Sequence, residues 1–273
     1  MALEDAGVRV DVRPVSSMLP HEEIIPSHVD RIAVEIRKEG IQRDPIILDA
    51  ETGAVLDGMH RLAAFRKIGL ENAVCSPVDY ASKVVSIHRW ARVYSQGRRG
   101  DISQALGDAG ILKRTTLSEA FAALDARGLG LAAMSAHGVF VPRVPLDLQG
   151  AFAVIRGLDA IATESGGRTN FVPEDEVDSA LQDADNVVLL VQRLGKDDVL
   201  LAARSGALFP CKTSMHVIDP RPVAVNAPIT ELSSMTGAEL RKRLQVTGGK
   251  LLPGGSYYQG RRYKERLLIL SAD

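Results

Sequence analysis

The stretch "AVLDGMHRLAAF", residues 54–65, places an acid, a glycine, a histidine and an arginine where a predicted strand gives way to a predicted helix. A turn requires Gly58, but it gives no reason for His60 and Arg61 to stand so close to Asp57. The first backbone N–H groups of a helix lack partners, and the helix dipole favours an anion at that end. The stretch therefore predicts a phosphate-binding turn.

A purely structural interpretation of the same residues is also open. In that interpretation Asp57 caps the helix, Gly58 makes the turn and Arg61 pairs with a carboxylate. Acidic helix caps of this kind are common. The stretch alone does not decide between the two.

The residues around this turn predict short strands that alternate with helices. A helix is expected to begin at a Ser27 cap and to close at Gly40, and a second helix is expected to end at Gly69. Strands are expected at 8–15, 45–49, 54–57, 69–82 and 83–94, of which 45–49 and 54–57 form a hairpin.

The character of the chain changes near residue 115. Asp101 is expected to cap one helix, and Thr116 with Glu119 has the spacing of a capping box at the start of another. A hairpin at 131–143 and a buried strand at 186–192 then predict a second α/β layer packed on the first.

The chain is therefore expected to be an α+β protein of two domains, residues 8–114 and 115–273. A C-terminal extension is expected from about residue 230. It holds a predicted short helix at 236–245 and a glycine-rich stretch at 247–265, which is expected to be a mobile loop or an interface arm.

Composition limits the classes of function. The 273 residues are 45% hydrophobic, with 33 basic against 34 acidic side chains and a net charge of −1, so charge alone does not attract nucleic acid or membrane. Cys75 and Cys211 form no CxxC pair, and no apolar run approaches the roughly 18 residues of a membrane span. A soluble, reduced, cytoplasmic chain is expected.

Three further segments carry candidate chemistry. "LPHEEI", residues 19–24, offers Glu22 as a general base, against the alternative of an acidic surface turn. Trp90, the only tryptophan, stands among His88, Arg89 and Arg92, although a lone tryptophan is more often core than ligand wall.

The third segment is "LFPCKTSMHVIDP", residues 208–220. It brings Lys212, Thr213, Ser214 and His216 together in a loop that suits a phosphate or a carboxylate, or that is simply a polar turn.

Together these segments resemble the free L-serine kinases of the ParB/sulfiredoxin-like superfamily, known from archaea and from bacterial siderophore clusters. The resemblance covers about residues 15–225 and rests on "PHE", "DGMHR", the tryptophan segment and "PCKTSMH" in this order. It implies a ParB/sulfiredoxin-like, nucleotide-binding N-terminal domain with a second α/β domain packed on it and the active site between them.

The resemblance also implies an activity. It is the transfer of a phosphoryl group from ATP or ADP to free L-serine, with Mg²⁺, giving the O-phospho-L-serine that family members feed into cysteine or diaminopropionate synthesis. No residue decides between the two nucleotides. L-Serine and nucleotide are the expected partners, a homodimer is left open, and neither membrane nor nucleic acid is expected.

Roles follow from matching positions. The resemblance implies that Glu22 is the catalytic base and that Asp57, His60 and Arg61 line the nucleotide-phosphate and metal site, with Asp57 as the Mg²⁺ ligand. By the same matching, Gly58 and Met59 belong to the phosphate site. The residues assigned to the amino-acid substrate are Trp90, Lys212, Thr213, Ser214 and His216.

This sequence departs from the family pattern at two positions. Met59 stands where archaeal members often have a second histidine, and Met215 stands where an arginine is usual.

Two alternatives within the superfamily are separable. Sulfiredoxin needs a reactive cysteine where this chain has Met59, so that activity is excluded on chemical grounds. A ParB-like, ligand-sensing DNA-binding regulator is the second hypothesis, supported by the basic run "GRRYKER" at residues 260–266.

Overall fold

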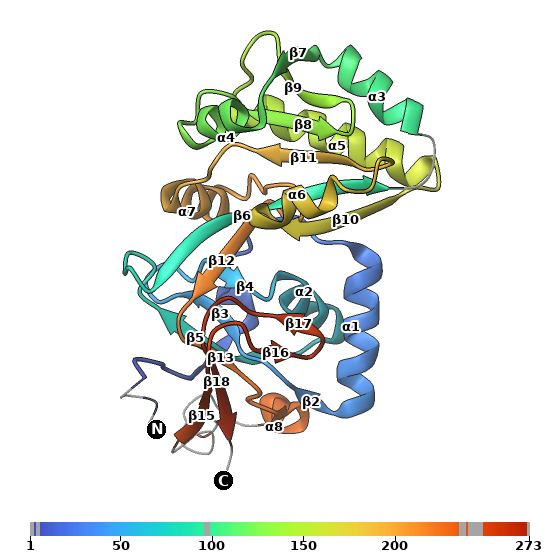
Figure 1. The fold of residues 1–273 in the computed structure, drawn as a ribbon. Helices are drawn as coiled ribbons and strands as arrows, with labels where there is room; N and C mark the ends of the chain where they lie inside the picture. Colours follow the sequence, from blue (N-terminus) through green and yellow to red (C-terminus); the bar gives the residue numbers. More distant parts are fainter. Residues whose placement is uncertain (1–2, 4–5, 96–98, 235–238, 240–247, 272–273) are drawn as a thin grey trace. The chain divides into compact units, whose positions relative to one another are not determined.

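The structure is a computed structural model that describes residues 3, 6–95, 99–234, 239 and 248–271 (Figure 1). By backbone packing the chain forms two compact units. One is built from residues 1–86, 196–211 and 216–273, and the other from 87–195 and 212–215. This division does not coincide with the boundary expected at residue 114, because the second unit takes strand β6 from upstream and the chain later returns to the first unit.

The first unit contains a four-stranded sheet in the order β1-β5-β3-β4. Its strands are β1 (Asp11–Pro14), β5 (Asn72–Val78), β3 (Ile46–Asp49) and β4 (Val55–Asp57). β3 and β4 form the expected antiparallel hairpin, while β3 runs parallel to β5.

Helices α1 (Pro26–Glu39) and α2 (Met59–Ile68) pack on this sheet. Their apolar faces enclose a core that includes Ala33, Leu62 and Phe65 against Ile46 and Leu48. The expected closing glycines are confirmed, since Gly40 and Gly69 end the two helices in the left-handed conformation.

One expected cap in this unit is wrong, and so is the cap that the purely structural interpretation of residues 54–65 requires. Ser27 does not cap α1, because Pro26 occupies the first turn and Ile25 precedes it without a side-chain cap. Proline suits that position, since its missing N–H would lack a partner in any case. Asp57 does not cap α2, because Gly58 holds the N-cap position.

The remaining pieces of the first unit are short. They are η1 (Val15–Ser17), β2 (Ile41–Gln42), α7 (Lys196–Ser205), β13 (Arg221–Val223), β14 (Ala227–Pro228), α8 (Ile229–Ser234), β15 (Gly248–Leu252), β16 (Tyr257–Tyr258), β17 (Arg261–Arg262) and β18 (Leu267–Ser271). β13, β18 and β15 form a three-stranded sheet in that order.

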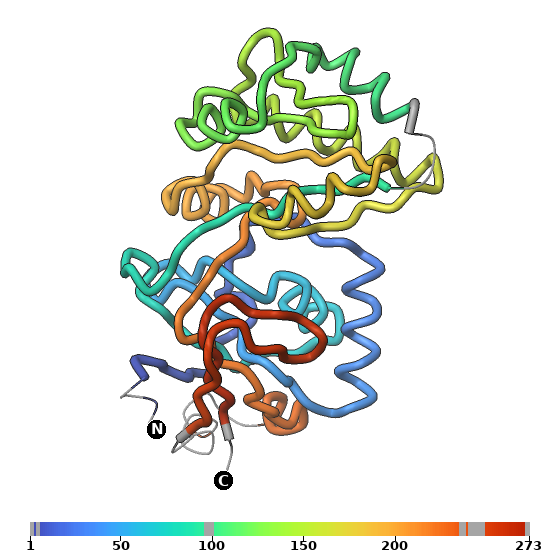
Figure 2. Tube along the Cα trace, viewed as in Figure 1, coloured from blue at the N-terminus to red at the C-terminus, as the bar shows by residue number. Residues whose placement is uncertain are grey.

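The described end of the C-terminal extension, residues 248–271, is therefore not the mobile loop that its glycines suggested, while its role as an interface arm stays a prediction. Figure 2 shows it as the red part of the trace, and it belongs to the same unit as the N-terminal strands. Leu268 and Leu270 of β18 share a core with Val74 of β5. The short helix expected at 236–245 lies outside the described residues.

The second unit is built on a sheet in the order β10-β6-β11-β8-β9-β7, with β12 beside β6. Its strands are β6 (Val85–Ser95), β7 (Ile111–Thr115), β8 (Leu131–Ser135), β9 (Gly138–Pro142), β10 (Arg168–Pro173) and β11 (Val187–Val191). Of β12 (Ser214–Ile218), the first two residues belong to this unit. Its helices are α3 (Arg99–Asp108), α4 (Leu117–Asp125), α5 (Leu148–Glu164), η2 (Glu174–Glu176) and α6 (Val177–Ala180).

Local signals in this unit are mostly confirmed. Thr116 and Glu119 form a complete capping box at the start of α4, and β8 with β9 is the expected hairpin. Asp101 is not a cap, because it is the third residue of α3. Within the described residues no helix is both long and apolar enough to cross a bilayer.

Candidate active site

The turn before α2 requires glycine for two reasons. Gly58 has φ +102°, a conformation that side chains disfavour, and a Cβ placed there would lie 2.9 Å from Arg61 Nη2 and 3.0 Å from Ile46 Cδ1. The missing side chain of Gly58 therefore lets the Arg61 guanidinium pack against the turn. Met59 follows with a buried side chain and contributes to the core.

Arg61 is held on the turn by three acceptors. Its Nη2 donates to Asp57 Oδ2 at 2.9 Å and to the Pro45 carbonyl at 3.2 Å, and its Nη1 lies 3.5 Å from Asp44 Oδ2. The structural alternative is thus half right, since Arg61 does pair with a carboxylate. That pairing also leaves a cation fixed beside the N-terminus of a helix, where an anion is favoured.

A second arginine meets Asp57 from the C-terminal part of the chain. Arg221 Nη1 lies 3.4 Å from Asp57 Oδ2, its Nη2 donates to the His216 carbonyl at 2.6 Å, and its Nε donates to Glu265. Burial alone would lower the pKa of Arg221, but the carboxylates of Asp57 and Glu265 raise it. Arg221 therefore remains a cation although only 3% of it is exposed.

Sequence reasoning did not identify Arg221 or Glu265 as part of the site. The available signal was weak: an arginine opens the otherwise apolar run "RPVAV" at residues 221–225. A charge within a buried strand implies a buried partner, but the sequence does not name that partner.

His60 connects the turn to the segment that contains Glu22. Its Nε2 accepts a hydrogen bond from the Ile25 backbone N–H at 3.0 Å, so a neutral His60 carries its proton on Nδ1. The ring centroid of His60 lies 5.7 Å from that of His28, which is in the first turn of α1. His60 thus ties the start of α2 to the loop that enters α1.

Glu22 is not on an acidic surface turn, because only 6% of the residue is exposed. Its segment is pinned by main-chain contacts, including a bridge between Glu22 and Phe209 and a hydrogen bond from the Glu23 N–H to the Phe209 carbonyl. His21 Nε2 lies 3.8 Å from Glu22 Oε1. Because burial lowers the pKa of His21, with Glu22 opposing that shift, the neighbour of this carboxylate is a neutral ring.

His216 lies in the same buried cluster. Its ring is 5.5 Å from that of His21, and its Nε2 is 2.7 Å from the Tyr80 hydroxyl. Burial, followed by the proximity of His21 and Arg221, places the pKa of His216 well below its ordinary value. Burial also raises the pKa of Tyr80, so this hydrogen bond joins a neutral hydroxyl and a neutral imidazole.

In the second unit Trp90 and Lys212 are brought together. Lys212 Nζ lies 5.2 Å from the centroid of the Trp90 ring, and the lysine backbone has φ +55°. Backbone strain of this kind at a non-glycine residue concentrates at functional sites. Thr213 and Ser214 follow with buried side chains. The motif divides after Met215, because His216 belongs to the first unit.

The polar residues beside Trp90 serve the structure of the second unit. Arg89 is fully buried and donates to Glu174, Asp125 and the Val191 carbonyl. Arg92 pairs with Asp159 in the same way. Both guanidiniums are therefore used as internal links.

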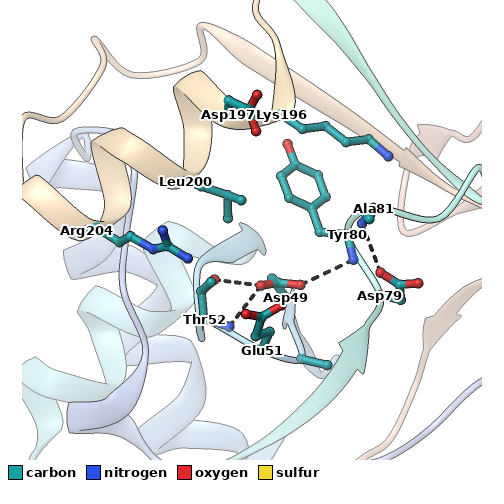
Figure 3. A pocket seen from close by; sticks show the side chains of 11 residues that line it. Asp49, Glu51, Thr52, Asp79, Tyr80, Ala81, Lys196, Asp197, Leu200 and Arg204 are labelled. Atoms are coloured by element: carbon teal, nitrogen blue, oxygen red, sulfur yellow. Dashed lines mark hydrogen bonds between the residues drawn. The ribbon is translucent and has the colours of Figure 1, made fainter.

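A separate cavity of about 460 Å³ lies in the first unit, at the end of β3 away from Asp57 (Figure 3). Tyr80, Lys196 and Arg204 line it with several carboxylates. One of these, Asp49, accepts from the backbone and hydroxyl of Thr52 and from the backbone of Tyr80, so it holds the loops in place. Across the described residues, no group of three or more His, Cys, Asp or Glu side chains is placed to hold a metal ion.

Several known proteins that are similar to this chain are L-serine kinases. No protein-family model matches the chain. The ATP-dependent L-serine kinase of Staphylothermus marinus is 25% identical over 239 residues, covering 80% of this chain and 89% of the relative. The ADP-dependent L-serine kinase SerK of Thermococcus kodakarensis is 23% identical over 228 residues, covering 80% of this chain and 90% of the relative.

A solved structure of free serine kinase in complex with AMP has the same fold. It superposes with a TM-score of 0.69 at 21% identity, covering 82% of this chain and 94% of that one. The chain is therefore a homologue of the L-serine kinases and has the fold of the free serine kinases.

Proposed function

We propose that this protein is a kinase that transfers a phosphoryl group from ATP or ADP to the hydroxyl of free L-serine, giving O-phospho-L-serine. The observation that carries the proposal is the cluster of Arg61, Asp57 and Arg221 at the N-terminus of α2. Two fixed guanidiniums beside a helix N-terminus suit a polyphosphate. The resemblance to two L-serine kinases over four fifths of the chain supports the choice of acceptor.

The nucleotide phosphates would bind at the turn formed by Gly58 and Met59. The N–H groups of the first helical turn, Arg61 and the ring of His60 would contact them. These groups are already fixed by the contacts described above, so little reorganisation is needed when negative charge shifts to the leaving nucleotide. Phosphoryl transfer depends mostly on such positioning and electrostatics.

Glu22 would act as the general base. The serine hydroxyl oxygen forms a bond to the terminal phosphorus, its proton passes to the Glu22 carboxylate, and the bond to the leaving ADP or AMP breaks. Glu22 suits this role because it is buried and its segment is pinned to Phe209. His21 beside it is a neutral ring, because burial lowers its pKa.

The amino-acid substrate would be bound by Trp90, Lys212, Thr213, Ser214 and His216. Lys212 supplies a cation for the serine carboxylate, and the two hydroxyls supply hydrogen bonds. His216, kept neutral by burial, adds no positive charge near the serine ammonium.

Mg²⁺ would accompany the nucleotide. The residue that would hold the ion is Asp57, whose Oδ2 also faces two arginines. As a carboxylate, Asp57 offers the hard oxygen that Mg²⁺ prefers, and it would contact the metal directly or through a bound water. Mg²⁺ commonly keeps several waters and binds through one or two carboxylates plus phosphates, which this arrangement fits. The ion would neutralise phosphate charge during the reaction.

One assay tests the proposal. The purified protein is incubated with Mg²⁺, L-serine and either ATP or ADP, and phosphoserine is followed by ³¹P NMR. Phosphoserine formed with one of the two nucleotides supports the proposal and identifies the donor. Its absence with both, in a folded protein, would contradict it. A cytoplasmic location stays a prediction from the sequence, and a homodimer is left open.

A further inference from the structure

The C-terminal segment, residues 248–271, is built into the first unit. Its last strand, β18, runs parallel to β13 and pairs Leu267 with Arg221. Leu267 and Leu268 are fully buried. At Gly254 a Cβ would lie 2.4 Å from the Lys264 carbonyl, so the two arms of the segment pack backbone to backbone. The segment therefore has a defined backbone conformation, which places Tyr258 and Glu265.

One of these side chains fixes Arg221. Glu265 is 6% exposed and accepts from Arg221 Nε, while the His216 carbonyl accepts from Arg221 Nη2. With two nitrogens held in this way, the planar guanidinium directs its third nitrogen, Nη1, toward Asp57 at 3.4 Å.

A second side chain acts on Arg61. The Tyr258 hydroxyl donates to Asp44 Oδ1 at 3.2 Å, and the same oxygen accepts from the Ala224 N–H at 2.8 Å. The other oxygen of Asp44 lies 3.5 Å from Arg61 Nη1. Tyr258 and Ala224 thus orient the carboxylate that faces Arg61.

We infer that Tyr258 and Glu265 are positioning residues for the nucleotide phosphates. They hold Arg61 and Arg221, which both contact Asp57 Oδ2, and they act from a segment in which the sequence pattern gave no site residue. The inference rests on the proposed function for the identity of the anion, a nucleoside polyphosphate.

Charge and positioning predict opposite results for Glu265. If Glu265 acted only through its negative charge, neutralising it would strengthen binding of an anion nearby. If it positions Arg221, neutralising it would weaken binding, because the guanidinium loses the partner that fixes its direction. Glu265→Gln therefore distinguishes the two effects by sign.

The test measures ADP binding by calorimetry with EDTA present and without serine, alongside kcat, KM and the melting temperature. Tyr258→Phe is expected to raise the Kd for ADP by about three- to tenfold, the range set by one lost hydrogen bond. Tyr257→Phe is the matched control, because Tyr257 is the adjacent residue of β16 and is 73% exposed. An unchanged Kd in Tyr258→Phe would overturn the inference.

Glu265→Gln is expected to raise the Kd for ADP by about tenfold or more, since a charge-assisted contact is lost. Its control is Arg266→Gln in the same segment, which breaks an exposed ion pair with Asp219. Arg266 accepts a hydrogen bond from the Arg221 N–H through its backbone carbonyl, which this substitution leaves in place. Tighter binding in Glu265→Gln would overturn its positioning role. If that variant does not fold, the tyrosine pair decides.

The outcomes also separate the two proposals. If the parent protein binds ADP and Tyr258→Phe raises the Kd for ADP, but the parent forms no phosphoserine, the proposed function alone is contradicted. If the parent protein is an active kinase and Tyr258→Phe leaves its Kd for ADP unchanged, this inference alone is contradicted. If the parent protein binds neither ATP nor ADP, both proposals are overturned.

Discussion

At the scale of single residues, the turn at Gly58 combines a backbone requirement with a contact requirement. Many glycines in this chain have positive φ, but few also have a functional side chain where the Cβ would stand. Gly40 shows the difference, because it has φ +70° and no atom within 4 Å of a built Cβ. Substituting Gly40 therefore measures the cost of backbone strain alone, and substituting Gly58 adds the cost of displacing Arg61.

Gly58→Ala is expected to weaken ADP binding by about ten- to a hundredfold, since it displaces a charge-assisted contact worth about 1.5–3 kcal/mol. Gly40→Ala is expected to lose only stability, about 1–2 kcal/mol for a left-handed alanine. Calorimetry with ADP and urea unfolding of both variants measure the two effects. Parental ADP affinity in Gly58→Ala would show that Arg61 does not contact the phosphates.

Glu22 and Glu23 are adjacent carboxylates with different surroundings. Glu22→Gln keeps the size of the side chain and removes its capacity to take a proton, so phosphoserine formation is expected to slow by about a hundredfold or more. Glu23→Gln is expected to keep most of the activity. Initial rates are compared with melting curves and ADP affinity, which should stay near parental values in both variants. Equal losses of rate in the two would remove Glu22 as the base.

At the scale of elements, the second unit is held together through buried charges. Arg89 of β6 links Glu174, which opens η2, to Asp125 at the end of α4. Arg193, after β11, contacts the same two carboxylates. Removing one partner from such a network is costly, because it leaves the other charge buried and uncompensated.

Acid unfolding should report on this network. Burial raises the pKa of Glu174, but hydrogen bonds from His88 and Arg89 outweigh it and bring the pKa to about 2. A folded-state pKa below the unfolded value adds stability that is present above about pH 4.5 and is lost as the pH falls toward 2. At about 1.36 kcal/mol per pKa unit, the contribution is at most about 3 kcal/mol.

Glu174→Gln is therefore expected to be less stable near neutral pH and to lose less stability than the parent between about pH 5 and pH 2. Urea unfolding across that range measures both. Glu176→Gln, an exposed residue of the same short helix, is the control. A parental pH profile in Glu174→Gln would mean that the ion pairs of Glu174 do not contribute to stability.

At the scale of the whole molecule, the features that could be predicted from the sequence are those set by residues close together in the chain. The β3–β4 hairpin, the closing glycines of α1 and α2, and the Thr116–Glu119 capping box follow from contacts a few residues apart. The pairing of Arg221 with Glu265 spans 44 residues and has no local signal. Two domains were expected, but the bounds of the two units differ from the expected ones, because each unit is assembled from separated parts of the chain.

DNA binding tests the remaining alternative, a ParB-like regulator, on the intact protein. Nonspecific affinity for duplex DNA comes from cations that release counterions, and this chain has a net charge of −1. Arg261 and Arg262 form β17, where Arg261 packs 4.6 Å from the centroid of the Tyr263 ring. We expect the Kd for random duplex to exceed about 10⁻⁴ M at physiological salt, the weak limit of nonspecific binders.

Fluorescence anisotropy at low and at physiological salt measures this binding. Truncating the basic run is unsuitable, because β18 and its buried leucines would be removed with it. The double variant Arg261→Gln and Arg262→Gln keeps that strand and removes two charges. The regulator hypothesis would be favoured if the parent binds DNA sequence-selectively and the double variant loses this binding but keeps its affinity for ADP. Weak binding that is equal in both proteins, and that disappears with salt, is what the proposed kinase requires.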